Sequence, residues 1–145
     1  MDINKAIKAK ISSYFVKRPE VLAVYLYGSQ AKGFAREDSD IDLAILVKDH
    51  KSFSGFDIPQ TRYLYDLEKL TGKRVEVQDL AFEPIDFAQR VISEGRILVG
   101  LNSKKRIEFE ENILRVYFDL KPSIDEYYKY LNQMAKRGEL DVRYI

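Results

Sequence analysis

The sequence predicts an α+β fold, in which a small mixed sheet is flanked by helices and followed by a C-terminal helical tail. Two observations predict the sheet. Residues 21–27 and 41–47 are apolar runs of the kind found in buried strands, and residues 75–80 alternate apolar and polar side chains. A third observation predicts the helices, because apolar residues recur at helical spacing around those segments. The chain has 145 residues and no linker-like tract, so we expect one domain, with a core over residues 1–100 and a tail over residues 101–145.

The first helix is predicted from Ile3, Ile7, Ile11 and Phe15, which share one helix face. Pro19 follows, and the residue before a proline is disfavoured in helical conformation, so the helix ends there. We therefore expect an amphipathic helix that packs this face on the sheet.

Two further helices are predicted around the third strand. The first opens at Asp57 or Pro59 and ends at Gly72, which suits the left-handed position that follows a helix. Its apolar stripe consists of Tyr63, Leu64, Leu67 and Leu70. The second covers residues 83–95 and leads into a short edge strand at residues 96–99.

The tail is predicted to be helical from Ser103 to the end of the chain. Pro122 should separate two helices, because proline fits a first helical turn better than a helix interior. Several apolar and aromatic side chains fall on one stripe of the second helix, namely Ile124, Tyr127, Tyr128, Leu131, Met134 and Ala135. This stripe suits either the core or a protein interface, where tyrosine and methionine are enriched.

Composition excludes several classes of protein. There are no cysteines, so thiolate metal sites and cysteine nucleophiles are excluded. The 24 basic and 23 acidic residues leave a net charge of +1, and we expect no strong nucleic-acid binding. The N-terminus does not resemble a signal peptide, and no apolar run approaches the ~20 residues of a membrane span. We expect a soluble, cytoplasmic protein.

Gly28 and Ser29 follow a predicted buried strand and are candidates for binding phosphate. Glycine lets a phosphate approach the backbone closely, and the hydroxyl of Ser29 adds a donor. The segment is not a Walker A loop, because Phe34 and Ala35 occupy the positions where that motif needs lysine and then serine or threonine. We interpret this turn as a cradle for a triphosphate.

Asp40 and Asp42 lie two residues apart at the start of the second strand, so their carboxylates should project to the same face. Magnesium prefers one or two carboxylates together with phosphate oxygens, and two ions held by shared carboxylates can catalyse phosphoryl or nucleotidyl transfer. The same residues could also form an ordinary polar turn and a solvated strand face. The presence of Gly28 and Ser29 at a fixed distance favours the catalytic interpretation.

The combined pattern, Gly-Ser followed after ten residues by Asp-x-Asp, resembles the signature of polymerase β-like nucleotidyltransferases. The wider segments GSQAKG and SDIDLAIL resemble the minimal nucleotidyltransferases (MNT) that act as antitoxins beside HEPN-domain toxins. The resemblance implies that Gly28 and Ser29 bind the phosphates of ATP and that Asp40 and Asp42 bind magnesium. It also implies a HEPN partner, a hetero-oligomer, and transfer of AMP to a tyrosine of an RNase toxin.

The superfamily takes a third carboxylate from a later strand, which here is the strand at residues 75–80. Glu76 and Asp79 differ by an odd number, so on a regular strand only one of them can face the metals. We choose Glu76 as the third catalytic and metal-binding residue, with Asp79 as the alternative. Lys32 is a candidate for a phosphate contact, at a position where the family often has arginine.

The function has alternatives from other classes. The protein could be a non-catalytic antitoxin that neutralises its partner by contact, or a transferase that modifies a small molecule. The lone histidine, His50, has no histidine or cysteine companion and is interpreted as a surface residue.

Overall fold

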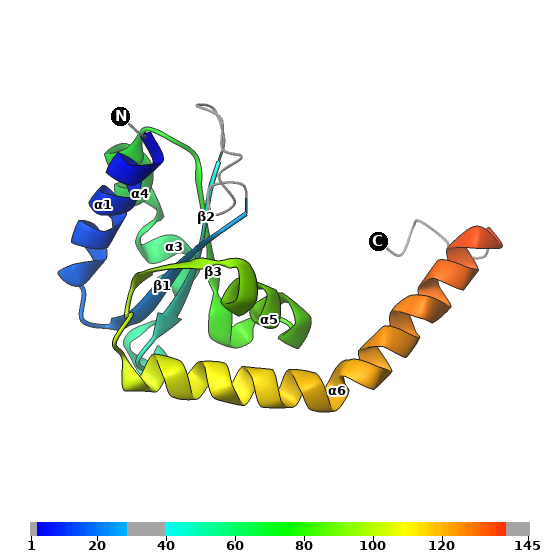
Figure 1. The fold of residues 1–145 in the computed structure, drawn as a ribbon. Helices are drawn as coiled ribbons and strands as arrows, with labels where there is room; N and C mark the ends of the chain where they lie inside the picture. The colour runs from blue at the N-terminus through cyan, green and yellow to red at the C-terminus, as the bar shows by residue number, and fades with distance from the viewer. Residues whose placement is uncertain (1–2, 29–39, 139–145) are drawn as a thin grey trace.

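The fold is taken from a computed structural model, which describes residues 3–28 and 40–138. The helices are α1 (Ile3–Val16), α3 (Pro59–Arg62), α4 (Leu64–Thr71), α5 (Ile85–Glu94) and α6 (Lys104–Lys136). The strands are β1 (Val21–Tyr27), β2 (Ile41–Val47), β3 (Val75–Asp79) and β4 (Arg96–Val99). Short 3-10 turns, η1 (His50–Ser52) and η2 (Leu80–Phe82), follow β2 and β3. Figure 1 shows the helices placed around one sheet, so the predicted α+β fold is confirmed.

The four strands form one sheet in the order β3-β2-β1-β4. β1 pairs antiparallel with both β2 and β4, whereas β2 and β3 are parallel, so the sheet is mixed as predicted. The predicted edge strand at residues 96–99 lies at one edge, beside β1. The other edge is β3, which explains why its sequence alternates instead of being apolar throughout.

Each face of the sheet is covered by different helices (Figure 1). On one face Ile7, Ile11 and Phe15 of α1 pack against the sheet together with Tyr63 and Leu67 of the α3–α4 segment. On the other face side chains of α5 and α6 cover a second apolar cluster, which includes Ala23, Tyr25, Ala44, Leu46, Ala88 and Val91. Successive side chains of β1 and β2 point to opposite faces of the sheet, so each strand contributes to both apolar clusters.

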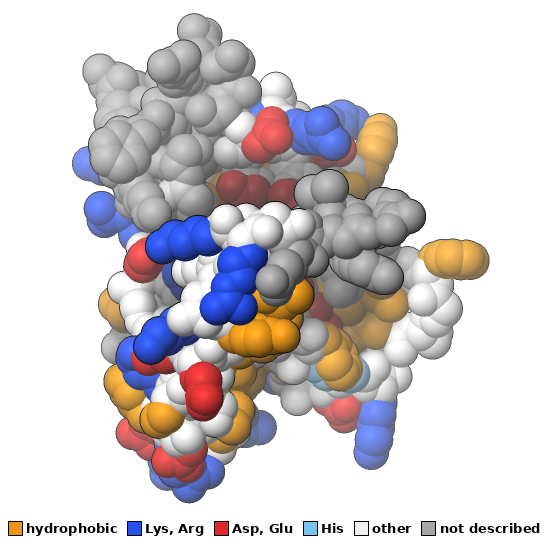
Figure 2. Space-filling model, turned by 90° about the vertical axis from the view of Figure 1, so that its right-hand side faces the viewer, with side chains coloured by type: hydrophobic (Ala, Val, Ile, Leu, Met, Phe, Trp, Pro, Cys, Tyr) orange, Lys and Arg blue, Asp and Glu red, His pale blue; other side chains and the backbone are white. Residues whose placement is uncertain are grey.

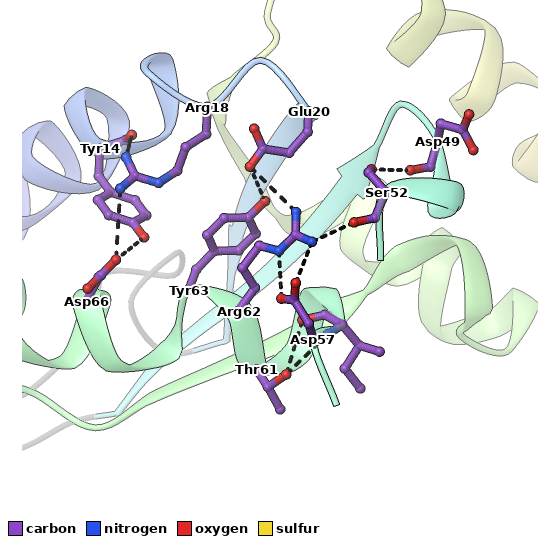
Figure 3. Close-up of polar contacts among 11 residues, drawn as sticks. Tyr14, Arg18, Glu20, Asp49, Ser52, Asp57, Thr61, Arg62, Tyr63 and Asp66 are labelled. Carbon is purple, nitrogen blue, oxygen red and sulfur yellow. Dashed lines mark hydrogen bonds and ion pairs between the residues drawn. The ribbon is translucent and has the colours of Figure 1, made fainter. Parts of the chain in front are cut away.

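A polar cluster closes the outer side of the α1–α3–α4 layer (Figure 3). Arg62 binds both carboxylate oxygens of Asp57, at 2.7 and 2.8 Å, and stacks over the ring of Phe53. The hydroxyl of Tyr63 donates to Glu20 at 2.6 Å, and burial together with this bond raises the pKa of Tyr63 well above its usual value. These contacts fasten α3 to the loop that precedes it and to the start of β1, and they account for the charged side chains on this layer.

The start of α6 is fastened to the sheet by a buried arginine. The guanidinium of Arg106 donates to the backbone oxygen of Gly100 at 2.7 Å and to Glu110 at 2.6 Å, and Glu110 in turn accepts a hydrogen bond from Tyr25 of β1. Because Arg106 and Glu110 are a helical turn apart, they form a paired charge within the helix as well as a link to the sheet.

The prediction that Pro122 separates two helices was wrong. α6 runs without interruption from Lys104 to Lys136, with Pro122 inside it. The ribbon bends where its colour turns from yellow to orange (Figure 1). A proline removes one backbone hydrogen bond and clashes with the preceding turn, which a bend can accommodate without ending the helix.

Beyond the bend, α6 extends away from the sheet (Figure 1). The hydroxyl of Tyr128 donates to Asp86 of α5 at 2.8 Å, but Tyr127, Tyr128 and Tyr130 are 47–58% exposed. Figure 2, which faces this end of the molecule, shows hydrophobic side chains next to lysines and arginines on the surface. The predicted stripe is therefore not used to cover the sheet. Within residues 3–28 and 40–138, none of the helices combines the length and apolar character that a membrane span requires.

Candidate active site

Gly28 ends β1 in a backbone conformation that favours glycine, with a φ angle of +73°. A Cβ atom at this position would also lie 2.5 Å from Oδ2 of Asp42. The absence of a side chain therefore lets the carboxylate of Asp42 approach the turn. The other residues predicted for phosphate binding, Ser29 and Lys32, lie outside the described residues.

Asp42 is at the centre of the candidate site, on β2, which lies between β1 and β3 in the sheet. Its partner on β1 is Tyr27, and its partner on β3 is Glu76. The carboxyl group is half-buried, and burial, together with the nearby Glu76 and Asp40, raises its pKa to about 6. Asp40 precedes β2 and is exposed. Three acidic side chains thus lie near one another, and their repulsion favours a cation among them.

The two candidates for the third carboxylate lie on opposite faces of β3. Glu76 is exposed and in register with Asp42, on the face that α5 and α6 partly cover. Asp79 is three residues later, so it points to the other face, where it is 1% exposed. The structure therefore brings Glu76, and not Asp79, together with Asp40 and Asp42.

Asp79 has structural partners on its own face. Nε2 of His50 lies 2.7 Å from Oδ2 of Asp79, and Oδ1 accepts a hydrogen bond from the backbone amide of Ala81 at the start of η2. His50 also packs edge-on against Phe82. The side chain of His50 is 36% exposed, so it does lie at the surface, but the sequence analysis missed that its ring pairs with a buried carboxylate distant in sequence.

Tyr27 is a neighbour of the site that the sequence analysis did not single out. It precedes Gly28, it is paired with Asp42, and its ring meets that of Phe87 on α5 at 90° and 5.5 Å between centroids. Burial, with additional effects from Asp42, Glu76 and Glu83, raises the pKa of Tyr27 well above its usual value. Tyr27 lies two residues after Tyr25 and therefore on the same strand face, which could have indicated that it faces the site. The apolar run of β1 gave no reason to single it out.

The carboxylates of the candidate site could supply some of the ligands of a magnesium ion, but not all of them. Within residues 3–28 and 40–138, no group of three or more histidine or acidic side chains is arranged so that it could hold a metal ion. Magnesium, however, is usually held by one or two carboxylates and completes its shell with water and substrate phosphates. Asp42 and Glu76 on adjoining strands, with Asp40 beside them, supply such an incomplete set.

Residues 9–105, more than half of the chain, match the family described as polymerase beta, nucleotidyltransferase. The chain belongs to this family. The match includes Gly28, Asp40, Asp42 and Glu76, so all the described candidates lie inside the nucleotidyltransferase region. The match ends at residue 105, so α6 lies beyond it from Arg106 onward.

Several solved structures of similar fold are toxin–antitoxin complexes. A chain of a toxin–antitoxin complex with AMP-PNP matches with a TM-score of 0.71 and 22% identity, over 86% of this nucleotidyltransferase and 97% of that chain. A chain of the MntA–HepT complex matches with a TM-score of 0.66 and 20% identity, over 88% and 97%. The complex of a tri-AMPylated HEPN toxin with an MNT antitoxin from Shewanella oneidensis matches with a TM-score of 0.67 and 20% identity, over 88% and 98%. No curated protein sequence matches the chain.

We expect magnesium to raise the melting temperature of this nucleotidyltransferase near neutral pH, because a cation offsets the repulsion around Asp42. In EDTA, Asp42→Asn should melt higher than the unmodified chain, and it should lose most of the increase that magnesium causes. Scanning calorimetry with and without magnesium checks both statements. Equal melting temperatures of the unmodified chain in EDTA and in magnesium would contradict a cation site at Asp42.

The same repulsion predicts a pH dependence. The pKa of Asp42 is about 6 in the folded chain and 3.8 ordinarily, so the folded state takes up the proton first as the pH falls. In EDTA the contribution of Asp42 to the free energy of unfolding should therefore increase as the pH falls from neutral through about 6, and it should level off only near pH 3.8. Subtracting the melting curves of Asp42→Asn from those of the unmodified chain isolates this contribution.

Proposed function

We propose that this nucleotidyltransferase is an antitoxin that transfers AMP from ATP to a tyrosine hydroxyl of a HEPN-family RNase toxin in the cytoplasm and thereby neutralises it. Residues 1–100 would form the catalytic core, and residues 101–145 would pack on that core and on the toxin. The observation that carries the proposal is the placement of Asp42 between Gly28 and Glu76 on three adjoining segments of the sheet. In this arrangement the turn proposed to bind phosphate lies directly against a carboxylate pair.

The proposed reaction is a displacement at the α-phosphorus of ATP. The acceptor oxygen forms a bond to that phosphorus, the bond to the bridging oxygen breaks, and pyrophosphate leaves, while the hydroxyl proton passes to solvent. Two bound magnesium ions would activate the acceptor hydroxyl and stabilise the leaving pyrophosphate. Asp40, Asp42 and Glu76 would hold those ions.

The remaining residues would bind and orient the nucleotide. The backbone of Gly28 would allow close approach of the phosphates, since it has no side chain that could obstruct them. Ser29 and Lys32 would add a hydroxyl donor and a cation to the same turn. Positioning of this kind, together with charge stabilisation, supplies most of the catalysis in phosphoryl-transfer enzymes.

The similar structures support both the nucleotide and the partner. One of them contains AMP-PNP, and another contains an AMPylated HEPN toxin bound to an MNT antitoxin. The exposed tyrosines of distal α6 support a second protein as partner, since aromatic residues and methionine are enriched in protein interfaces. Each transferred AMP would add a phosphate charge, which near an RNA-binding site repels the substrate backbone.

The proposal is tested by mixing the protein with a HEPN-family RNase toxin, ATP and magnesium. We expect the mass of the partner to increase by whole AMP units. The RNase activity of the partner should stay low after the two proteins have been separated. A partner of unchanged mass that regains activity on separation would instead show an antitoxin that acts by contact.

A further inference from the structure

A pocket of about 210 Å³ adjoins the carboxylate site between the end of β1 and α5. It is lined by Tyr27, Gly28, Phe87, Arg90, Val91 and Glu94. Gly28 belongs both to this pocket and to the turn that contacts Asp42, so the two sites are continuous. The volume is below the ~300–1,000 Å³ of sites that enclose whole drug-sized ligands, so the pocket suits one ring system of a larger ligand.

One wall of the pocket is aromatic. The rings of Tyr27 and Phe87 meet edge to face, with 5.5 Å between their centroids. Because the two rings do not stack on each other, a ring face remains for contact with a ligand. Both side chains are half-buried, so they are held in place yet reachable from the pocket. Flat aromatic ligands, and nucleobases in particular, stack on walls of this kind.

The other wall brings two opposite charges to one helix face. Phe87, Arg90 and Glu94 are three and four residues apart on α5, so they line up along the side of the helix that faces Gly28. Arg90 is exposed and offers guanidinium donors, whereas the carboxylate of Glu94 offers acceptors. The edge of a purine presents a ring-nitrogen acceptor next to an amino donor, which complements this pair.

We propose that this pocket binds the adenine base of the nucleotide, with Tyr27 and Phe87 against the ring and Arg90 and Glu94 at its edge. The proposal rests on the function proposed above, since phosphates held at Gly28 leave the rest of ATP to the adjoining pocket. A tyrosine acceptor is the less suitable occupant, because a phenol presents one hydroxyl, whereas adenine presents donors and acceptors to both charged side chains of this wall. The acceptor would then approach from the side of Glu76.

The test compares two ligands that share the phosphates and differ in the base. Calorimetric titrations use magnesium ATP and magnesium tripolyphosphate with the full chain. Phe87→Leu keeps an apolar side chain but removes the ring, and Arg90→Ala alters an exposed residue. Gln89→Ala is the matched control, because Gln89 lies on α5 outside the pocket and bonds to Ser93.

We expect Phe87→Leu and Arg90→Ala each to weaken ATP binding about tenfold and to leave tripolyphosphate binding unchanged. Gln89→Ala should change neither. Equal losses for both ligands, or unchanged ATP binding with a raised KM for the acceptor protein, would overturn the base assignment while the proposed function stands. If the unmodified chain binds neither ligand in magnesium, the proposed function itself fails.

Discussion

The double variant Asp40→Asn, Asp42→Asn should lose AMP transfer while it keeps its fold. Removing two carboxylates removes the charge that holds the ions, and metal stabilisation of the transition state contributes several kcal/mol. At about 1.4 kcal/mol for each tenfold change, we expect transfer to decrease by about 10³-fold or more. The measurement is AMP incorporation into the partner protein, with circular dichroism to monitor the fold.

Asp49→Asn is the matched control for this variant, because Asp49 is exposed, follows the opposite end of β2 from Asp42, and accepts a hydrogen bond from the amide of Lys51 that asparagine can also accept. It should transfer AMP at the unmodified rate. The double variant should also melt at the same temperature as the unmodified chain or higher, since Asp40 is exposed and Asp42 is held at an electrostatic cost. Full transfer by the double variant would show that the active site lies elsewhere.

Glu76→Gln and Asp79→Asn should have opposite effects, although the two positions are three residues apart on one strand. Glu76 is exposed beside Asp42, so Glu76→Gln should decrease AMP transfer by about 10²-fold or more and leave the melting temperature unchanged or higher, because it removes a charge that repels Asp42. Asp79 is buried and paired with His50, so Asp79→Asn should cost about 1–3 kcal/mol of stability and leave transfer intact below the melting temperature.

Initial rates of AMP transfer and thermal melts on the same samples separate these effects. His50→Ala should resemble Asp79→Asn, because it removes the other partner of the same hydrogen bond. If Asp79→Asn abolishes transfer in a fully folded sample and Glu76→Gln does not, the third metal ligand is Asp79.

The sheet and most helices could be predicted from the sequence, because their signals are local. Ile7, Ile11 and Phe15 repeat at helical spacing and are all buried. Alternation on β3 was enough to show that Glu76 and Asp79 point to opposite faces. The local signal was insufficient at Pro122, because the cost of a proline inside a helix can be met by a bend.

The parts of the site that could not be predicted depend on contacts between distant segments. The pairing of His50 with Asp79 joins residues 29 positions apart, and the packing of Tyr27 on Phe87 joins β1 to a helix that follows β3. The glycine at position 28 could be predicted for a turn, but its role in admitting the carboxylate of Asp42 requires the register of β1 against β2. Periodicity contains no information on such registers.

The separation of the acidic residues between the two faces of the sheet has an evolutionary consequence. On the face proposed to be catalytic, a neutral residue in place of the half-buried Asp42 would avoid the cost of burying a charge beside Glu76, so a substitution expected to end AMP transfer should also stabilise the fold. Random drift would therefore push such a chain toward inactive descendants that still fold and still present α6. One nucleotide substitution is enough to replace an aspartate with asparagine. Under the proposed function, this step would leave an inactive antitoxin that acts by contact alone, and only selection for AMP transfer would oppose it.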